Sequence, residues 1–384
     1  MPDNMESAAA RVRAAIADAS RGLVDREVLV ELIALSAVAG QHLLVIGPPG
    51  TAKSEAVRRF ARVLEGAYFE YLLGRFTEPS EIFGPVDFRR LKEGFVETDV
   101  TGMLPEAEIA FLDEVFQGST AILNTLLGIL NERVFRRGHT LVRCPLRVCV
   151  GASNALPADE SLAAFADRFL LRAYVQPVSD ARLEELLEGG WSLDTAPLSA
   201  RATMADLDLL VETTRNAKLT VARPLLAHAI RELRKHGVAL SDRRAVKVQR
   251  VIAAAAALAG RSEPTAADLW PIVFVAPTAE QQALAREALR DLLAPSENAS
   301  LPAAAEEASL GPAARATRIV RAGRELLDTR PESSEGEEAI AWRLRLEGVA
   351  REIDAGFAPE QRSEELGAVR DEIAAILEPV PASA

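Results

Sequence analysis

The sequence predicts an α/β fold, in which a parallel sheet flanked by helices is followed by further helical regions. Three observations support this prediction. A glycine-rich loop at residues 47–54 joins an apolar run to a helical stretch, and a second apolar run at 109–112 ends in two carboxylates. From residue 180 onwards the composition is helical throughout. Apolar runs that alternate with helical stretches are typical of a parallel sheet buried on both faces.

The bulk composition limits the possible classes of protein. A chain of 384 residues with 49% hydrophobic residues can form two or three domains with sizeable cores. The net charge of -12 disfavours a general affinity for nucleic acid or for an anionic membrane. Two cysteines, Cys144 and Cys149, form no disulfide framework, and we therefore expect a reduced, cytoplasmic protein. No uncharged apolar run reaches the roughly 18 residues of a membrane-spanning helix.

The glycine-rich loop has the composition of a phosphate-binding loop. A polyphosphate needs converging backbone N–H donors and the positive end of a helix, and glycines let the backbone approach it closely. We expect Lys53 to reach the β- and γ-phosphates and the Ser54 hydroxyl to bind Mg²⁺. The loop departs from the usual pattern at Ala52, because glycine normally precedes the lysine. The predicted binding residues are Gly47, Pro48, Pro49, Gly50, Thr51, Ala52, Lys53 and Ser54.

The apolar run that ends in Asp113 and Glu114 complements this loop. In open parallel sheets, ligands bind beyond the carboxyl ends of the strands, so both carboxylates are expected beside the phosphates. We predict that Asp113 binds Mg²⁺ through its water shell and that Glu114 polarises the attacking water. Without the loop, the same pattern could be the N-cap of a helix.

Three polar residues farther along the chain are weaker candidates. Asn154 follows a predicted strand, where its amide could orient the water; otherwise it is a turn residue before Pro157. Arg168 is too far along the chain to serve its own loop by local geometry, and it could serve a neighbouring subunit. The alternative is a surface ion pair with Asp167. Arg243, or its neighbour Arg244, could bend back to the phosphates from a helix start; the alternative is a solvated pair.

The chain divides into three predicted regions. Residues 1–178 form the α/β core, with strands at 42–46, 67–72, 108–114, 141–150 and 170–175. An irregular insert at about 74–105 is expected to contain a helix broken at 84–85 and a short hairpin near 94–98. Residues 179–277 form a helical lid. Residues 278–384 form a helical hairpin or bundle with a linker near 295–312, and segments 313–328, 335–354 and 359–377 are amphipathic.

The order of these motifs resembles that of AAA+ ATPases. The matching motifs are GPPGTAKS, FLDE, ASN and DRF. Longer stretches, YLLGRFTEPSEIFGP, GMLPEAEIAFLDEVF and AILNTLLGILNER, look like the MoxR branch and are most similar to its RavA-like group, over roughly residues 20–275. In that group alanine before the lysine is also familiar. The resemblance implies that residues 47–54 are Walker A, Asp113 and Glu114 Walker B, Asn154 sensor 1, Arg168 the arginine finger and Arg243 sensor 2. The insert corresponds to the helix-2 insert.

The resemblance also implies an assembly and partners. The family forms homo-oligomeric rings, typically hexamers, with ATP and Mg²⁺ bound between subunits. Its members work as chaperone-like remodellers of protein clients, often with a partner that carries a von Willebrand factor A domain. RavA proteins contain a further β-rich domain, which is not indicated here because no strand-rich segment follows residue 295.

These inferences lead to one main functional hypothesis. The chain is expected to be an ATPase that remodels a client or loads it with a metal or cofactor. The alternative is a nucleotide-controlled binding ring in which hydrolysis is incidental. A role on DNA is disfavoured by the acidic balance and by the absence of a separate DNA-binding motif in the sequence.

Overall fold

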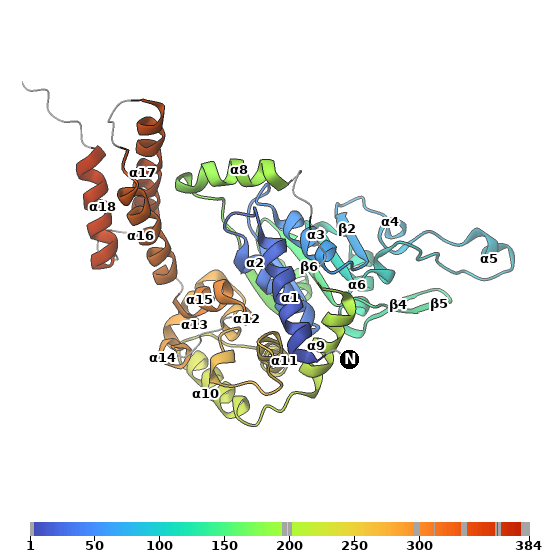
Figure 1. Cartoon of the computed structure of the whole chain (residues 1–384). Helices are drawn as coiled ribbons and strands as arrows, with labels where there is room; N and C mark the ends of the chain where they lie inside the picture. The colour runs from blue at the N-terminus through green and yellow to red at the C-terminus, as the bar shows by residue number, and fades with distance from the viewer. Residues whose placement is uncertain are drawn as a thin grey trace, which may run out of the picture. The chain divides into compact units, whose positions relative to one another are not determined.

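The fold is described from a computed structural model of residues 4–193, 198, 202–294, 300–310, 312–331, 336–357, 359 and 362–377 (Figure 1). The chain forms two compact units. The first contains residues up to 21, 26–176 and 197–309; the second contains 22–25, 177–196 and 310–384. All strands of the described residues lie in the first unit.

A five-stranded parallel sheet forms the centre of the first unit, which confirms the predicted α/β class. The two inner strands next to the glycine-rich loop, β1 and β6, are buried along their whole length, as expected for a sheet covered on both faces. The strand order is β2-β3-β6-β1-β7. The bounds are β1 Leu43–Ile46, β2 Tyr68–Leu72, β3 Ile109–Asp113, β6 Val148–Ser153 and β7 Leu171–Tyr174.

The single strand predicted at 141–150 is wrong, because the structure contains two strands there. β5 (Thr140–Arg143) pairs antiparallel with β4 (Val134–Arg137), and only β6 enters the main sheet. Pro145 lies between them and cannot donate a backbone hydrogen bond. The burial pattern gives the physical distinction: alternate residues of β5 are exposed, whereas every residue of β6 is buried.

The insert at 74–105 also differs from the prediction. As expected, a helix is interrupted near residue 84: α4 (Pro79–Phe83) ends at Gly84, whose φ is 105°, and α5 (Phe88–Lys92) follows. The predicted hairpin near 94–98 is only an isolated bridge between Val86 and Thr98.

The β4–β5 hairpin lies beside the insert (Figure 1). The backbone N–H of Thr98 donates to Thr140 Oγ1 over 2.7 Å, and the N–H of His139 donates to the Val96 carbonyl over 3.1 Å. The two segments therefore form one projection from the core.

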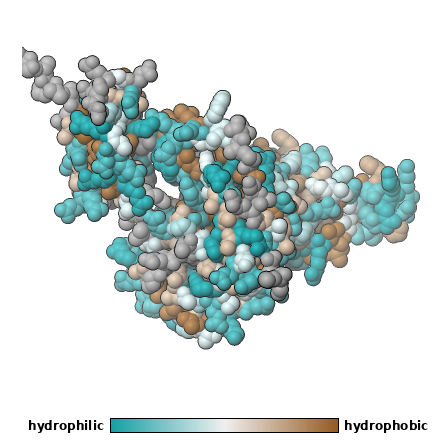
Figure 2. Space-filling model, viewed as in Figure 1, coloured by the Kyte–Doolittle hydropathy of each residue, from teal (hydrophilic) through white to brown (hydrophobic). Residues whose placement is uncertain are grey.

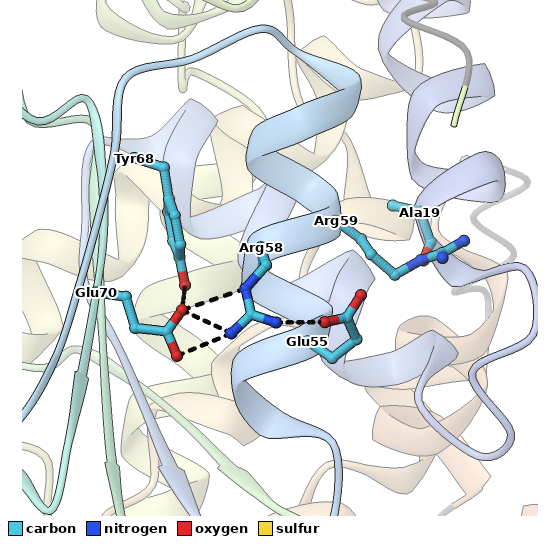
Figure 3. Close-up of polar contacts among 6 residues, drawn as sticks. All are labelled: Ala19, Glu55, Arg58, Arg59, Tyr68 and Glu70. Carbon is cyan, nitrogen blue, oxygen red and sulfur yellow. Dashed lines mark hydrogen bonds and ion pairs between the residues drawn. The ribbon is translucent and has the colours of Figure 1, made fainter. Parts of the chain in front are cut away.

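Helix α3 (Lys53–Val63), which follows the glycine-rich loop, is held on two sides (Figure 3). On one side Arg58 forms ion pairs with Glu55 of its own helix and with Glu70 of β2. On the other side, the buried Arg59 donates to the carbonyl of Ala19, at the end of α1 (Met5–Ser20), over 2.9 Å. These contacts fix the helix whose first residue is Lys53.

Helices that follow the sheet in sequence pack against it and against the N-terminal helices. Helix α11 (Asp242–Leu258) of the lid contacts α2 (Glu27–Ala39) of the core and α9 (Met204–Asn216) of the lid. The lid and the core therefore share packing contacts. The remaining helices of the core are α2 (Glu27–Ala39), α6 (Thr120–Glu132) and α7 (Glu160–Ala166). The later helices are α9 (Met204–Asn216), α10 (Ala222–Lys235), α11 (Asp242–Leu258), α12 (Ile272–Val275), α13 (Ala279–Ala288), α14 (Arg290–Leu293) and α15 (Pro302–Leu310).

The stretch predicted as a linker, 295–312, contains helix α15. Its first turn is held by Glu31 of α2, which accepts hydrogen bonds from the backbone N–H groups of Ala303 and Ala304. The alanine and proline content that favoured a linker is equally compatible with a short helix once a long-range partner is present. Residues 295–299 lie outside the described part of the chain.

The second unit is helical, as predicted for the C-terminal region. It contains α8 (Leu183–Leu193), α16 (Pro312–Asp328), α17 (Glu337–Gly356) and α18 (Glu364–Leu377). The last three helices share an apolar core that includes Trp342, Leu346 and Ile373. Over the described residues of the whole chain, no helix is long and apolar enough to cross a membrane.

Candidate functional site

The loop between β1 and α3 has backbone features that only particular residues allow. A Cβ on Gly47 would lie 2.3 Å from the carbonyl oxygen of Val175, so glycine is required where the loop passes the end of β7. Gly50 has a φ of 76°, which glycine adopts without strain. The loop then enters α3 at Lys53, and the free N–H groups of the first turn carry a partial positive charge.

The Lys53 side chain folds back into this loop. Its Nζ donates to the carbonyls of Gly47 and Pro48, both over 2.8 Å, and the residue is buried. Burial lowers the pKa of Lys53, while Asp113 and Glu114 act in the opposite direction. The ammonium therefore lies inside the loop, bonded to oxygens that phosphate oxygens could replace.

Three side chains meet this loop at the carboxyl edge of the sheet. The register places Ser153 beside Ile46 and Leu112 beside Gly151. Asp113 therefore ends β3, Glu114 follows it, and Asn154 follows the adjacent strand β6. Asn154 Nδ2 donates to Glu114 Oε1 over 2.8 Å. The structure therefore brings together four residues that the sequence places up to a hundred positions apart.

Glu114 is held in an uncommon conformation. Its φ is 47°, in the left-handed region, and its backbone N–H donates to Asp113 Oδ1 over 2.9 Å. Non-glycine residues in this region are enriched at functional sites, because the surrounding structure must impose the conformation. Here the conformation turns the carboxylate toward Asn154, while Asp113 remains beside the loop.

These residues fit a nucleotide phosphate chain and a magnesium ion. The site offers backbone N–H groups, the Lys53 ammonium, the Ser54 hydroxyl in the first turn of α3, and the Asp113 carboxylate. Within the described residues, no group of three or more His, Cys, Asp or Glu side chains could hold a metal by itself. A metal here would need phosphate and water oxygens as well, which is the coordination that Mg²⁺ prefers.

Arg26, which sequence reasoning missed, binds the backbone of the glycine-rich loop. This buried residue precedes α2, and its Nε donates to the Thr51 carbonyl over 2.8 Å. Its Nη2 donates to the carbonyl of Gln176, after β7, over 2.8 Å. Both partners are backbone atoms at distant positions, so no local sequence signal marks this role.

Arg168 lies at the opposite edge of the sheet. It precedes β7, whose first residue, Leu171, is in register with Leu43 at the start of β1, whereas the phosphate loop follows the end of β1. At about 3.3 Å per residue, the four residues of β1 alone separate the two edges by roughly 13 Å. Arg168 and its own phosphate loop are not brought together.

The predicted alternative for Arg168, an ion pair with Asp167, is wrong in this structure. Asp167 pairs with Arg244, whose Nε lies 2.6 Å from Asp167 Oδ1. Arg168 Nε is instead buried without a hydrogen-bond partner. An unsatisfied buried donor on a charged group is costly.

The two arginines at the start of α11 have different surroundings. Arg244 is 1% exposed, and besides Asp167 it contacts the carbonyls of Phe169, Leu170 and Val275. Arg243 contacts Asn131 Oδ1 at the end of α6, and burial together with Arg168 lowers its pKa. Arg243 therefore lies at the end of α6, where its charge interacts with that of Arg168.

A depression adjoins Glu114. Its volume is about 490 Å³, and it is lined by the segment Tyr71–Thr77 together with Glu81 and Glu114. This segment leads from β2 into the insert, so the depression lies between Glu114 and the start of the insert.

Comparisons with known proteins agree with this geometry. Residues 10–212, more than half of the chain, match the family model described as the MoxR domain in the MoxR-vWA-beta-propeller ternary systems. Residues 223–286 match an AAA lid domain. An uncharacterised protein of Methanocaldococcus jannaschii, MJ0079, is 36% identical over 250 residues, which are 64% of each chain.

Two further likenesses are more distant. The chaperone MoxR1 of Mycobacterium tuberculosis is 27% identical over 216 residues, 54% of this chain and 56% of that protein. The chain thus spans less than two thirds of the length of either relative. A crystal structure of a putative ATPase from Cytophaga hutchinsonii has a TM-score of 0.60 at 16% identity and covers 74% of this chain and 94% of that one. This last likeness concerns the fold alone.

Proposed function

Because the chain belongs to the MoxR family of AAA+ ATPases, we propose that it hydrolyses ATP at the interfaces of a homo-oligomeric ring and uses the energy to remodel a client protein. The single observation that carries this proposal is the cluster of Lys53, Asp113, Glu114 and Asn154 at one edge of the sheet. Each of these residues has the chemistry that one step of phosphoryl transfer to water requires.

Within one copy of the chain, the residues divide the work. The loop N–H groups and Lys53 hold the phosphates, and Ser54 and Asp113 would hold Mg²⁺, which when bound withdraws negative charge from the phosphate oxygens. Glu114 orients the attacking water by accepting a hydrogen bond from it. Asn154, through its 2.8 Å bond to Glu114, fixes the carboxylate and can release it when its amide turns to a phosphate.

Arg168 supplies charge to the site of a neighbouring copy. Two observations support this part of the proposal: the residue lies at the sheet edge opposite its own loop, and its Nε is buried without a partner. Arg243 lies with Arg168 and would approach the same neighbouring phosphates. An arginine provided in this way contributes on the order of 10³–10⁵ in rate.

The ring, its partners and its location follow from the family and are proposed on that basis. We propose that the ring is a hexamer and that the chain belongs to the RavA-like group. We also propose that it works in the cytoplasm, where Cys144 and Cys149 stay reduced; both are free and buried. The matched family model describes systems with a von Willebrand factor A partner, and we propose such a partner here. Loading of a metal or cofactor into the client is one form that the remodelling could take.

We propose that the projection formed by the insert and the β4–β5 hairpin contacts the client. Hydrophobic side chains are exposed at its tip, among them Phe88, which is 73% exposed, and Phe95 and Val96. Figure 2 shows hydrophobic and hydrophilic side chains mixed there. Exposed aromatic and aliphatic side chains at the end of a projection are available to contact apolar groups of a client.

The variant Glu114→Gln tests the proposed ATPase. The amide has the size of the carboxylate but cannot accept a proton, so ATP binding should persist while turnover falls by at least about 100-fold. ATP affinity by calorimetry and phosphate release by a coupled assay give the two readouts. Glu132→Gln, an exposed residue at the end of α6, is the matched control. Normal turnover by Glu114→Gln would show that Glu114 does not activate the water.

The same assays address the alternative of a nucleotide-controlled ring. If the unmodified chain binds ATP but hydrolyses it negligibly, even with a von Willebrand factor A partner added, ATP would act as an assembly ligand and the proposed motor would be wrong.

A further inference from the structure

The first turn of α11 is fixed against the core by Arg244. Its guanidinium bonds to three residues of the segment 167–170, through the Asp167 carboxylate at 2.6 Å and the carbonyls of Phe169 at 3.0 Å and Leu170 at 2.9 Å. Arg168 lies within this anchored segment. The side chains next to Arg244 on α11 therefore have a defined position relative to Arg168.

Lys247 follows Arg243 by four residues on α11, so the two side chains lie on the same face of the helix. Arg243 contacts Asn131 at the end of α6, and Arg133 caps the same helix. The charges of Arg243, Arg133 and Arg168 all act on Lys247. Lys247 thus lies where the start of α11, the end of α6 and the segment before β7 meet.

The positive charges of Arg168, Arg243 and Lys247 are not balanced by ion pairs. Over the described residues, no carboxylate forms an ion pair with Arg168, Arg243 or Lys247; the nearby Asp167 pairs with Arg244. The neighbouring His42 carries no charge, because burial keeps its pKa well below the ordinary value and the imidazole ring stays neutral. A half-buried group of cations without a counter-ion is an anion-binding arrangement.

We propose that Lys247 is a third cation of this site and that, with Arg168 and Arg243, it binds the terminal phosphate of a nucleotide held by a second copy of the chain. This inference rests on the proposed function, since the phosphate must come from the neighbouring loop. The chemistry favours a phosphate over a carboxylate, because several oxygens can accept hydrogen bonds from three donors at once.

Lys247 also makes the site respond to pH. Desolvation first, and then Arg243, Arg133 and Arg168, lower its pKa to about 8, while Asp167 acts in the opposite direction. The free site therefore carries the full charge at pH 7 and loses one charge as the pH rises through about 8. Binding of a phosphate favours the charged lysine, so a proton is taken up on binding above that pH.

The test compares ATP hydrolysis by the unmodified chain and by Lys247→Met and Lys247→Arg variants between pH 7 and 9. At pH 7, Lys247→Met should lower kcat roughly 10- to 100-fold, the effect of one charge-assisted hydrogen bond, with ATP affinity within about two-fold. In the unmodified chain kcat/KM should fall with a midpoint near pH 8, whereas Lys247→Arg should retain activity without that fall, because arginine stays protonated. Lys235→Met, on the exposed side of α10, is the control.

Three results decide the matter. Recovered activity in Lys247→Arg with the fall near pH 8 removed supports the inference. A Lys247→Met variant with unchanged kcat and an unchanged pH profile overturns it, and if Arg168→Ala is inactive in the same assay the proposed function still stands. If Arg168→Ala is fully active, the neighbouring site itself is wrong and the role of Lys247 falls with it.

Discussion

At the scale of single residues, two positions of the site adopt a backbone conformation that side chains usually avoid. Ala52 has a φ of 56° and Glu114 a φ of 47°. In the proposed reaction Glu114 needs its carboxylate, so its conformation must be held by the fold. Ala52 has no such need, and glycine would adopt the same φ without steric cost.

We therefore expect Ala52→Gly to stabilise the chain by about 1 kcal/mol, because it relieves the left-handed conformation without removing a contact of the loop. The measurement is chemical denaturation without nucleotide. Ala56→Gly, four residues later inside α3, should have the opposite effect by a similar amount, since it replaces alanine in a helix interior. Equal destabilisation by both variants would mean that the Ala52 conformation carries no strain.

At the scale of helices and strands, Arg244 connects the lid to the core. Its side chain is 2% exposed and contacts four partners on two separate segments. A buried charge with four hydrogen bonds holds its neighbours in one arrangement, and removal of the charge leaves those partners unsatisfied. The sequence left open whether Arg243 or Arg244 serves the nucleotide; the structure engages Arg244 in packing, so Arg243 remains the candidate.

Arg244→Met should lower the free energy of unfolding by about 3 kcal/mol or more and increase hydrogen exchange across residues 167–170. Arg250→Met, at an exposed position of the same helix, controls for the loss of a positive charge. Unchanged exchange at 167–170 would show that α11 is held by its apolar face alone.

A second contact between helices depends on pH. Glu31 of α2 is 6% exposed, and burial raises its pKa to about 7, while the two N–H groups at the start of α15 oppose that shift. A carboxyl with a raised pKa binds its proton more tightly in the folded state. The free energy of unfolding should therefore fall as the pH rises from the ordinary carboxyl pKa to about 7 and should not fall further above it.

Glu31→Gln should remove this dependence. Between pH 5 and 8 the unmodified chain should lose up to a few kcal/mol relative to the variant, at about 1.4 kcal/mol for each unit of pKa shift. Denaturation curves at both pH values provide the measurement, with Glu212→Gln, at an exposed position of α9, as the control. Parallel pH profiles for Glu31→Gln and the unmodified chain would contradict the prediction.

At the scale of the whole molecule, the proposed site is shared between copies of the chain. Arg168 lies at one edge of the sheet and Lys53 at the other, so one copy cannot complete its own site. Each copy would present its phosphate loop to one neighbour and its cations to the other, as in a closed ring with head-to-tail contacts.

Mixing two inactive variants tests this arrangement. Arg168→Ala subunits retain the phosphate loop and Lys53→Ala subunits retain the arginine, so some interfaces of a mixed ring are complete and hydrolysis should recover. The recovered rate should depend on the mixing ratio and exceed that of either variant by at least about 10-fold, given what an arginine contributes in such sites. No recovery at any ratio, with mixed assembly shown by native mass spectrometry, would argue against a site shared between copies.

Much of the fold could be predicted because local requirements are recorded in residue type. Gly47 and Gly50 mark the loop since no side chain fits there, and the uninterrupted apolar runs mark the buried strands. The β4–β5 hairpin was missed because its residue pattern is weak. β5 alternates between exposed and half-buried residues and lies just before Pro145, and its partner β4 has no strong apolar pattern.

By itself the sequence determined the α/β class, the glycine-rich loop between a strand and a helix, and the residues at the ends of the strands, because each depends on neighbours in the chain. Only the tertiary structure decided that Asp167 pairs with Arg244, that Arg26 supports the loop and that Arg168, Arg243 and Lys247 lie together. These contacts join segments separated by tens of residues. Their geometry depends on how helices pack on the sheet, which no local pattern specifies.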